Sequence, residues 1–212
     1  MLNMNMLLEL VVLLALCGVA LCFKPWAALR AQELRNPWLA ALALLPFVWS
    51  LQGVLPGSPP LQLSCTALLV LMVGWPLAVL TCVPVALCTA LIDGSGAVNA
   101  LHQAIWNGVL PATLALGIGI LTRRWLPQHL MVYILARGFG ATLLAMALTG
   151  GLWLLRHPLP PGSDVAAVLT GRWLVAWSDA VLSGMLCAIF VAWRPHWLLT
   201  YSDRRYLPVA PR

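Results

Sequence analysis

Charged residues are rare in this chain, and one long stretch, residues 61–92, carries none at all. Of the 212 residues, 62% are apolar and 8% are charged, and the mean hydropathy is +0.92. A soluble domain is about one-quarter charged, because its surface has to face water. The sequence therefore excludes an ordinary soluble fold. It predicts a single polytopic membrane domain over residues 1–212, with the lipid bilayer as its solvent.

The apolar runs have the length of membrane-spanning helices. A spanning helix needs about 20 apolar residues, and inside lipid only helices and closed barrels satisfy every backbone polar group. These runs are too long for barrel strands, so the predicted fold class is all-α. The run 61–92 exceeds one crossing and contains Gly74 and Pro76, so we expect it to divide there into two helices. The other predicted spans are residues 6–23, 38–55, 104–121, 131–155 and 165–193.

The basic residues support a count of seven spans. Lys and Arg in short loops favour the cytoplasmic side of a membrane. With seven spans three basic clusters share one side and Arg156 lies on the other, whereas six spans would separate the first cluster from the other two. The sequence thus predicts seven transmembrane helices with the N-terminus outside and the C-terminus in the cytoplasm, and gives no indication of nucleic-acid binding. The clusters are Lys24, Arg30 and Arg35; Arg123 and Arg124; and Arg194, Arg204, Arg205 and Arg212.

Ionisable residues inside the predicted spans are the first candidates for function. A charge in lipid costs a few kcal/mol, so a buried ionisable group is expected to be paired or functional. Asp179 lies midway along the last predicted span, Arg172 lies two helical turns before it, and Arg137 lies in the preceding span. We expect these three to form a buried polar cluster that fixes helix register. Direct participation in a substrate path and snorkelling of the two arginines are the alternatives.

Histidines and methionines raise the possibility of a transition-metal site, because imidazole and thioether groups suit such ions. His102 lies in the polar, glycine-containing segment 93–103, close to Asp93, and this segment is predicted to be an outer loop. We take His102 and Asp93 as candidate metal ligands. The other histidines, His129, His157 and His196, are expected to be ordinary solvated or interfacial residues. Met1, Met4 and Met6 suit either a soft-ion entrance or a hydrophobic helix start.

Motifs of enzymes are missing from the sequence. It contains no G-x-S-x-G, no H-E-x-x-H, no P-loop and no dinucleotide fingerprint. The six cysteines lie in apolar runs without a C-x-x-C pair, which favours packing roles over disulfides or zinc. The chain is therefore predicted to be neither an enzyme nor the holder of a cofactor, and it has no means of powering transport alone.

Several segments resemble one membrane-protein family. The sequence is similar to the CbiM-type cobalt/nickel permeases, the substrate-capture components of energy-coupling-factor ABC transporters. The resemblance covers roughly the last two-thirds of the chain. The matching segments are ALLVLMVGWP at 67–76, Asp93-Gly94 followed by NGVLP at 107–111, SDAVLSGM at 178–185, RPHW at 194–197 and SDRRYL at 202–207.

The resemblance implies a seven-helix component of the cell inner membrane with its N-terminus outside. It implies a transition-metal ion as substrate, and as partners a transmembrane coupling subunit and cytoplasmic ATPases. Family members that bind cobalt or nickel begin Met-His-Ile-Pro-Asp-Gly and have a further histidine before the third helix. This chain begins Met-Leu-Asn-Met-Asn-Met, and Gln62 best matches that histidine, so the resemblance is to a divergent member and the metal site cannot be carried over.

The functional prediction is accordingly a substrate-capture subunit for cobalt or nickel uptake, with Gln62, Asp93 and His102 as candidate residues of an outer pocket. The alternative is a membrane protein that keeps the permease fold without transporting anything, as a scaffold, assembly factor or signalling protein.

Overall fold

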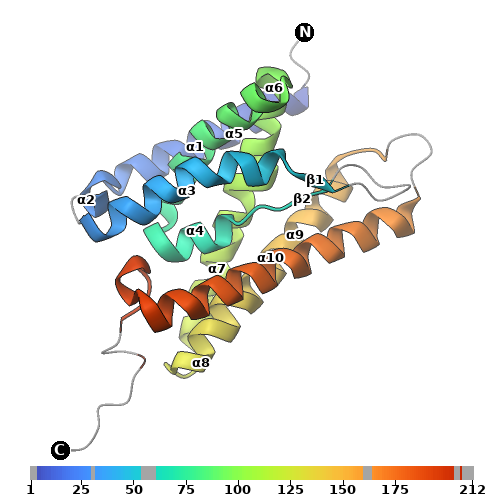
Figure 1. The fold of residues 1–212 in the computed structure, drawn as a ribbon. Coiled ribbons are helices and arrows are strands. Elements are labelled where there is room, and N and C mark those ends of the chain that lie inside the picture. Colours follow the sequence, from blue (N-terminus) through green and yellow to red (C-terminus); the bar gives the residue numbers. More distant parts are fainter. Residues whose placement is uncertain (1–3, 30–31, 54–60, 160–163, 203–205, 207–212) are drawn as a thin grey trace, which may run out of the picture.

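The computed structural model describes residues 4–29, 32–53, 61–159, 164–202 and 206. In these residues the chain is helical nearly throughout, with one antiparallel pair of two-residue strands in which Gln52 faces Gln62 (Figure 1). The elements are α1 (Met4–Cys22), α2 (Trp26–Leu29), α3 (Gln32–Ser50), β1 (Gln52–Gly53), β2 (Leu61–Gln62), α4 (Thr66–Val73), α5 (Trp75–Asp93), α6 (Gly96–Gln103), the π-helical turn η1 (Ala104–Val109), α7 (Leu110–Trp125), α8 (Leu130–Val132), the π-helical η2 (Tyr133–Gly140), α9 (Ala141–Arg156), α10 (Val165–Trp193) and the short 3₁₀ turn η3 (Pro195–Trp197).

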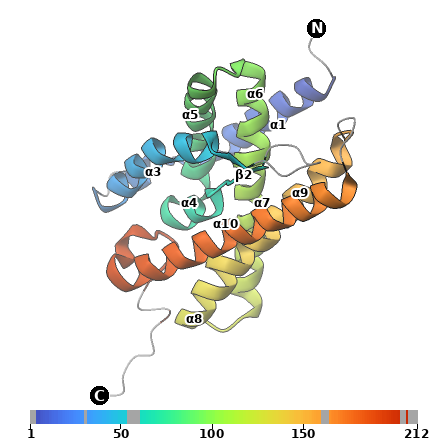
Figure 2. The same cartoon turned by 45° about the vertical axis from the view of Figure 1, so that its right-hand side comes forward.

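Seven helical rods make up the described part of the chain, and they run alternately between two ends of the molecule (Figures 1 and 2). The starts of α1 and α6 and the end of α9 meet at one end, called the pocket end. The end of α1, the start of α5 and the end of α10 lie at the other, called the tail end. The predicted number of helices is confirmed, while which end faces the cytoplasm stays a prediction. The rods are α1, α3, α4, α5, α6–η1–α7, α8–η2–α9 and α10.

The predicted break within residues 61–92 is present at Gly74, between α4 and α5. Gly74 has φ of 82°, a left-handed conformation that favours glycine, and its N–H ends α4 by donating to the Val70 carbonyl. A Cβ at this position would lie 2.9 Å from the end of the Leu199 side chain, so a larger residue would also displace that side chain. Pro76 falls in the first turn of α5, where its missing N–H costs nothing.

The segment 93–103, predicted to be an outer loop, is instead helical from Gly96. Gly94 and Gly96 adopt φ of 64° and 79°, so these two glycines complete the turn after α5 within three residues. The helix predicted to begin at residue 104 therefore begins eight residues earlier in the sequence, and Gly96–Trp125 forms one continuous rod. His102 is consequently a helical residue near the start of a membrane-spanning rod.

Among the described residues, four rods are long and apolar enough to cross a bilayer: Trp75–Asp93, Gly96–Trp125, Leu130–Arg156 and Val165–Trp193. The apolar helix Met6–Cys22 is somewhat shorter. In contrast, α4 has eight residues, about 12 Å of helix, and all of them are buried. The short helix α4 thus lies inside the protein, against α5 and α7, and forms part of the core.

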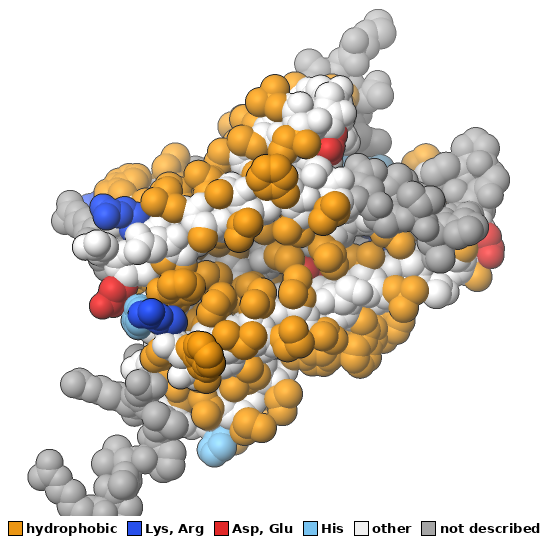
Figure 3. Space-filling view, viewed as in Figure 1, with side chains coloured by type: hydrophobic (Ala, Val, Ile, Leu, Met, Phe, Trp, Pro, Cys, Tyr) orange, Lys and Arg blue, Asp and Glu red, His pale blue; other side chains and the backbone are white. Residues whose placement is uncertain are grey.

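Hydrophobic side chains cover much of the face of the rods drawn in Figure 3, as a lipid-facing surface requires. Leu91, Leu155 and Trp193 are 83%, 87% and 82% exposed, respectively. The described basic residues of the three predicted clusters lie at the tail end, because Lys24 follows α1, Arg123 and Arg124 end α7, and Arg194 follows α10. Arg156 ends α9 at the pocket end. This distribution agrees with the charge asymmetry from which the number of spans was predicted.

Candidate metal site at the pocket end

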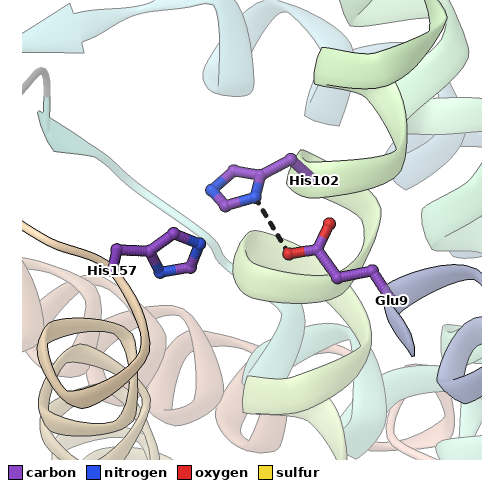
Figure 4. Close-up of side chains that lie close together, drawn as sticks. All are labelled: Glu9, His102 and His157. Atoms are coloured by element: carbon purple, nitrogen blue, oxygen red, sulfur yellow. Dashed lines mark hydrogen bonds and ion pairs between the residues drawn. The ribbon is translucent and has the colours of Figure 1, made fainter. Parts of the chain in front are cut away.

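Three potential metal ligands from distant parts of the chain meet at the pocket end (Figure 4). Glu9 comes from the second turn of α1, His102 comes from α6, and His157 follows the last residue of α9. One carboxylate oxygen and two imidazole nitrogens from these residues all lie within 4.8 Å of one another. This arrangement, called the Glu9 cluster below, depends on the packing of three different rods.

Glu9 supplies the negative charge of the cluster and is 8% exposed. The indole N–H of Trp106 donates to its Oε1 at 2.8 Å, and Nδ1 of His102 lies 3.3 Å from the same oxygen. A carboxylate in an apolar environment is costly unless hydrogen bonds or a cation compensate it. Glu9 therefore offers a carboxylate that could hold a cation, and its partners in the structure are the side chains of Trp106 and His102.

The two histidines are oriented by Trp153. Its indole N–H donates to Nε2 of His102 at 3.4 Å, which assigns the proton of a neutral His102 ring to Nδ1, facing Glu9. The ring of His157 stacks on the Trp153 ring, with centroids 4.8 Å apart and 22° between the planes. Nδ1 of His157 lies 3.1 Å from the Trp153 carbonyl oxygen, so a proton on that nitrogen leaves the lone pair on Nε2.

The local helix geometry brings His102 and Trp106 to the same side. The two residues are one helical turn apart, so both face Glu9. The turn lies where the rod passes into η1, and single π-helical turns inside α-helices recur at functional sites. Gly108 lies in η1. A Cβ there would lie 2.9 Å from Sγ of Cys82, so glycine allows the rod to pack closely against α5.

An open pocket of about 390 Å³ adjoins the Glu9 cluster. The side chains that complete its lining are Met6, Ser95, Val98 and Asn99. Two imidazoles with one carboxylate form a ligand set typical of first-row transition metals, and the thioether of Met6 would add a soft donor. The chemistry available here is thus reversible coordination of a divalent cation, with water in the remaining positions.

The structure brings together only part of the predicted metal-binding set. His102 lies in the Glu9 cluster, where its ring faces Glu9. Gln62 is half-buried in β2, and Asp93 is exposed at the end of α5; neither belongs to the cluster or lines its pocket. Asp93 is the last residue of α5, before the turn at Gly94, whereas His102 lies in the helix that follows this turn.

Two cluster residues were not predicted from the sequence. His157 was expected to be an ordinary solvated or interfacial histidine, and in the structure its ring stacks on Trp153 beside His102. Glu9 lies inside the first predicted span, residues 6–23, and was assigned no role. A signal was present for Glu9, because a lone acidic residue inside a predicted membrane helix indicates a functional or paired group.

The predicted cluster of Asp179, Arg137 and Arg172 is not assembled in the described structure. Asp179 is 1% exposed, and its two oxygens accept the backbone N–H groups of Ser64 and Cys65, each at 3.0 Å. Its partners are therefore main-chain amides at the start of α4. These amides would otherwise lack acceptors, since the first N–H groups of a helix have no partner within it.

The two arginines lie away from Asp179 because α10 packs antiparallel to the η2–α9 rod. A Cβ at Gly150 would lie 3.4 Å from Cβ of Arg172, and one at Gly138 would lie 3.1 Å from Cβ of Cys187. This register places Arg172 opposite the end of α9 and Arg137 opposite a later part of α10. Arg172 lies over the Trp153 ring, 4.2 Å from its centroid, and Arg137 donates to the Tyr206 hydroxyl at 3.2 Å.

The fold and the site together define a polytopic helical membrane protein with a transition-metal ligand set at one end. The chain belongs to the CbiM family, whose description is the cobalt uptake substrate-specific transmembrane region, and the family model matches residues 4–197. The resemblance noted in the sequence is thereby confirmed. It is a family of membrane transport proteins, so the chain is a multi-pass membrane protein of a cobalt-uptake family. Searches of curated proteins and of solved structures gave no significant match.

Proposed function

We propose that this chain is the substrate-capture subunit of an energy-coupling-factor transporter and that it takes up cobalt or nickel. In this proposal the divalent ion is the cargo, and it is first bound by Glu9, His102 and His157 on the outer side of the cell inner membrane. The proposal replaces the pocket of Gln62, Asp93 and His102 expected from the sequence, keeping only His102 of those three.

The observation that carries the proposal is the convergence of one carboxylate and two imidazoles within 4.8 Å. One carboxylate offsets part of the charge of a divalent ion, and the imidazoles add donors that Co²⁺ and Ni²⁺ accept readily. The cluster opens into a pocket of about 390 Å³ that is large enough for a hydrated ion. The membership of a cobalt-uptake family supports the same class of substrate.

The remaining parts of the transporter are proposed as partners. The sequence has no nucleotide-binding motif, so energy for uptake has to come from another chain. A transmembrane coupling subunit with cytoplasmic ATPases fits this requirement. The basic residues at the tail end support a cytoplasmic location for that end, and hence an external location for the Glu9 cluster.

Isothermal titration calorimetry tests the proposal directly. The protein is purified in detergent without a polyhistidine tag, stripped of metal with a chelator, and titrated with Co²⁺ and with Ni²⁺. We expect saturable binding near one ion per chain, and no binding of Mg²⁺, which prefers oxygen ligands. His102→Ala and His157→Ala should each weaken binding by about 10- to 100-fold or more, because the loss of a partner that only supports a metal ligand already costs that much.

His196→Ala is the matched control, because His196 is exposed in η3 at the tail end. It should bind the ions as the wild type does. Heat no greater than a blank titration for both ions would disprove the metal site. Co-purification separates the transporter from the alternative of a non-transporting scaffold: a capture subunit should bring down a coupling subunit and an ATPase from its native membrane, and a scaffold should not.

A further inference from the structure

Trp153 contacts both histidines of the Glu9 cluster. Its indole N–H donates to Nε2 of His102, its ring stacks on the ring of His157, and its carbonyl oxygen lies 3.1 Å from Nδ1 of His157. The residue is half-buried near the end of α9. One side chain therefore sets the orientation of two of the three proposed ligands, and it was not singled out from the sequence.

The hydrogen bond from Trp153 uses the lone pair that a metal ion would need. In a neutral imidazole one nitrogen carries the proton and the other carries the lone pair. At His102 the proton faces Glu9 from Nδ1, and the lone pair on Nε2 accepts the indole N–H at 3.4 Å. Coordination through Nε2 thus requires that the indole turns away. Coordination through Nδ1 requires that its proton moves to Nε2, where it would face the indole N–H, so the indole has to leave in that case too.

Arg172 holds the indole from the neighbouring helix. Its guanidinium carbon lies 4.2 Å from the centroid of the Trp153 ring, a cation–π distance. Gly150, one turn before Trp153, lets α10 approach at this level, since a Cβ there would lie 3.4 Å from Cβ of Arg172. The guanidinium Nε is buried without a hydrogen-bond partner in the described structure, so the aromatic face is a main support of this arginine.

We propose that Trp153 is a gate on the proposed metal site. This inference rests on the function proposed above. In the closed state the indole N–H occupies His102 Nε2 and Arg172 holds the ring in place. An incoming divalent ion takes that nitrogen, and the indole leaves it. Every ion then has to break the closed state to bind, so the gate lowers the apparent affinity and favours later release of the cargo.

The test compares metal affinity in Trp153→Phe and in the wild type. Phenylalanine keeps an aromatic ring for His157 and Arg172 but has no N–H to donate. Removing one neutral hydrogen bond from the closed state should tighten binding of Co²⁺ and Ni²⁺ by about three- to tenfold. Arg172→Gln, which removes the cation over the ring, should shift the affinity in the same direction by a smaller factor.

Trp193→Phe is the matched control, since Trp193 is 82% exposed at the end of α10. Its affinity should equal that of the wild type. Wild-type binding together with unchanged or weaker binding in Trp153→Phe would overturn the gate and leave the metal site standing. Absence of binding in the wild type and in Trp153→Phe would overturn the metal site, and the gate with it.

Discussion

Glu9 and Asp179 are both buried carboxylates in an apolar protein, at 8% and 1% exposure, but the protein supports them in different ways. Asp179 accepts two backbone N–H groups in a closed interior. Glu9 accepts N–H groups from side chains beside an open pocket. Backbone donors are fixed by the path of the chain, whereas side-chain donors can rotate about their χ angles. We infer that Asp179 is structural and that Glu9 is available to a cation.

The Asp179 carboxylate fixes the backbone turn at Ser64 and Cys65. It holds the turn that enters α4, where Cys65 has φ of 55°, a conformation that costs a non-glycine residue about 1–2 kcal/mol. The Ser64 hydroxyl donates to the Asn107 carbonyl at 2.6 Å, and the Trp49 indole donates to the Ser64 carbonyl at 2.9 Å. Hydrogen bonds from α3, η1 and α10 thus converge on this one turn and restrict its backbone conformation.

The largest expected effect is on stability, from Asp179→Ala. The substitution leaves the amides of Ser64 and Cys65 without their acceptor, at about 1–3 kcal/mol for each buried group. We expect a lower thermal unfolding temperature in detergent and a smaller yield of monodisperse protein. Size-exclusion chromatography and a thermal melt measure both quantities.

Asp179→Asn provides the control for this prediction, because its amide keeps one oxygen that can accept one of the two N–H groups. Its unfolding temperature should lie between those of Asp179→Ala and the wild type. If Asp179→Ala melts at the wild-type temperature, the carboxylate does not stabilise the turn. The folded fraction of either variant should still bind metal, since Asp179 contributes no ligand to the Glu9 cluster.

The reverse pattern is expected for Glu9→Gln. Glutamine keeps an oxygen for the N–H groups of Trp106 and His102 but removes the negative charge that a divalent ion needs. We expect affinity for Co²⁺ and Ni²⁺ to fall by about 10- to 100-fold or more in calorimetry, because the loss of a partner that only supports a metal ligand already costs that much. The melting temperature of the metal-free protein should stay the same or rise, because the variant no longer buries a charge.

Added metal sharpens this contrast further. An ion that binds only the folded protein stabilises it by about 2.7 kcal/mol at a free concentration of 100 times Kd. The wild type should therefore melt at a higher temperature with Co²⁺ or Ni²⁺ than without, while Glu9→Gln at the same concentration should gain much less. An equal increase in both proteins would show that Glu9 is not a ligand.

The difference between the two carboxylates also marks what could be predicted from the sequence. Hydropathy identified the rods, and Gly74 with Pro76 identified the break between α4 and α5, because both features depend on residues that are neighbours in the sequence. Asp179 was predicted to be buried, but its pairing with arginine was wrong. Backbone amides are present at every residue other than proline, so the sequence gives no signal that those of Ser64 and Cys65 are the partners.

The Glu9 cluster was predicted only at His102, for a related reason. Its three ligands belong to rods far apart in the sequence, and their meeting depends on the rotation and register of each rod. A shift of one residue turns a helical side chain by about 100°, which is enough to remove it from a site. Hydropathy does not specify this rotation, and two glycines placed the start of α6 where a loop was expected.

A third ion, the half-buried Arg137, provides the smallest test of the comparison. Its guanidinium donates to the Tyr206 hydroxyl at 3.2 Å and lies 5.4 Å from the centroid of the Tyr133 ring, so its partners are side chains, like those of Glu9. Tyr206→Phe removes the hydroxyl while keeping the ring packed on Tyr201, 5.3 Å away between centroids. We expect a loss of about 1 kcal/mol in stability, which lowers the melting temperature by about 2–4 °C, with no change in metal affinity.

A double-mutant cycle with Arg137→Gln isolates the interaction, because the second substitution should cost less once the hydroxyl is gone. Strictly additive losses would show that Arg137 depends on the aromatic faces rather than on Tyr206. Side-chain support alone would then not distinguish an ion available to a ligand from one that is structural, and the open pocket beside Glu9 would become the feature that does.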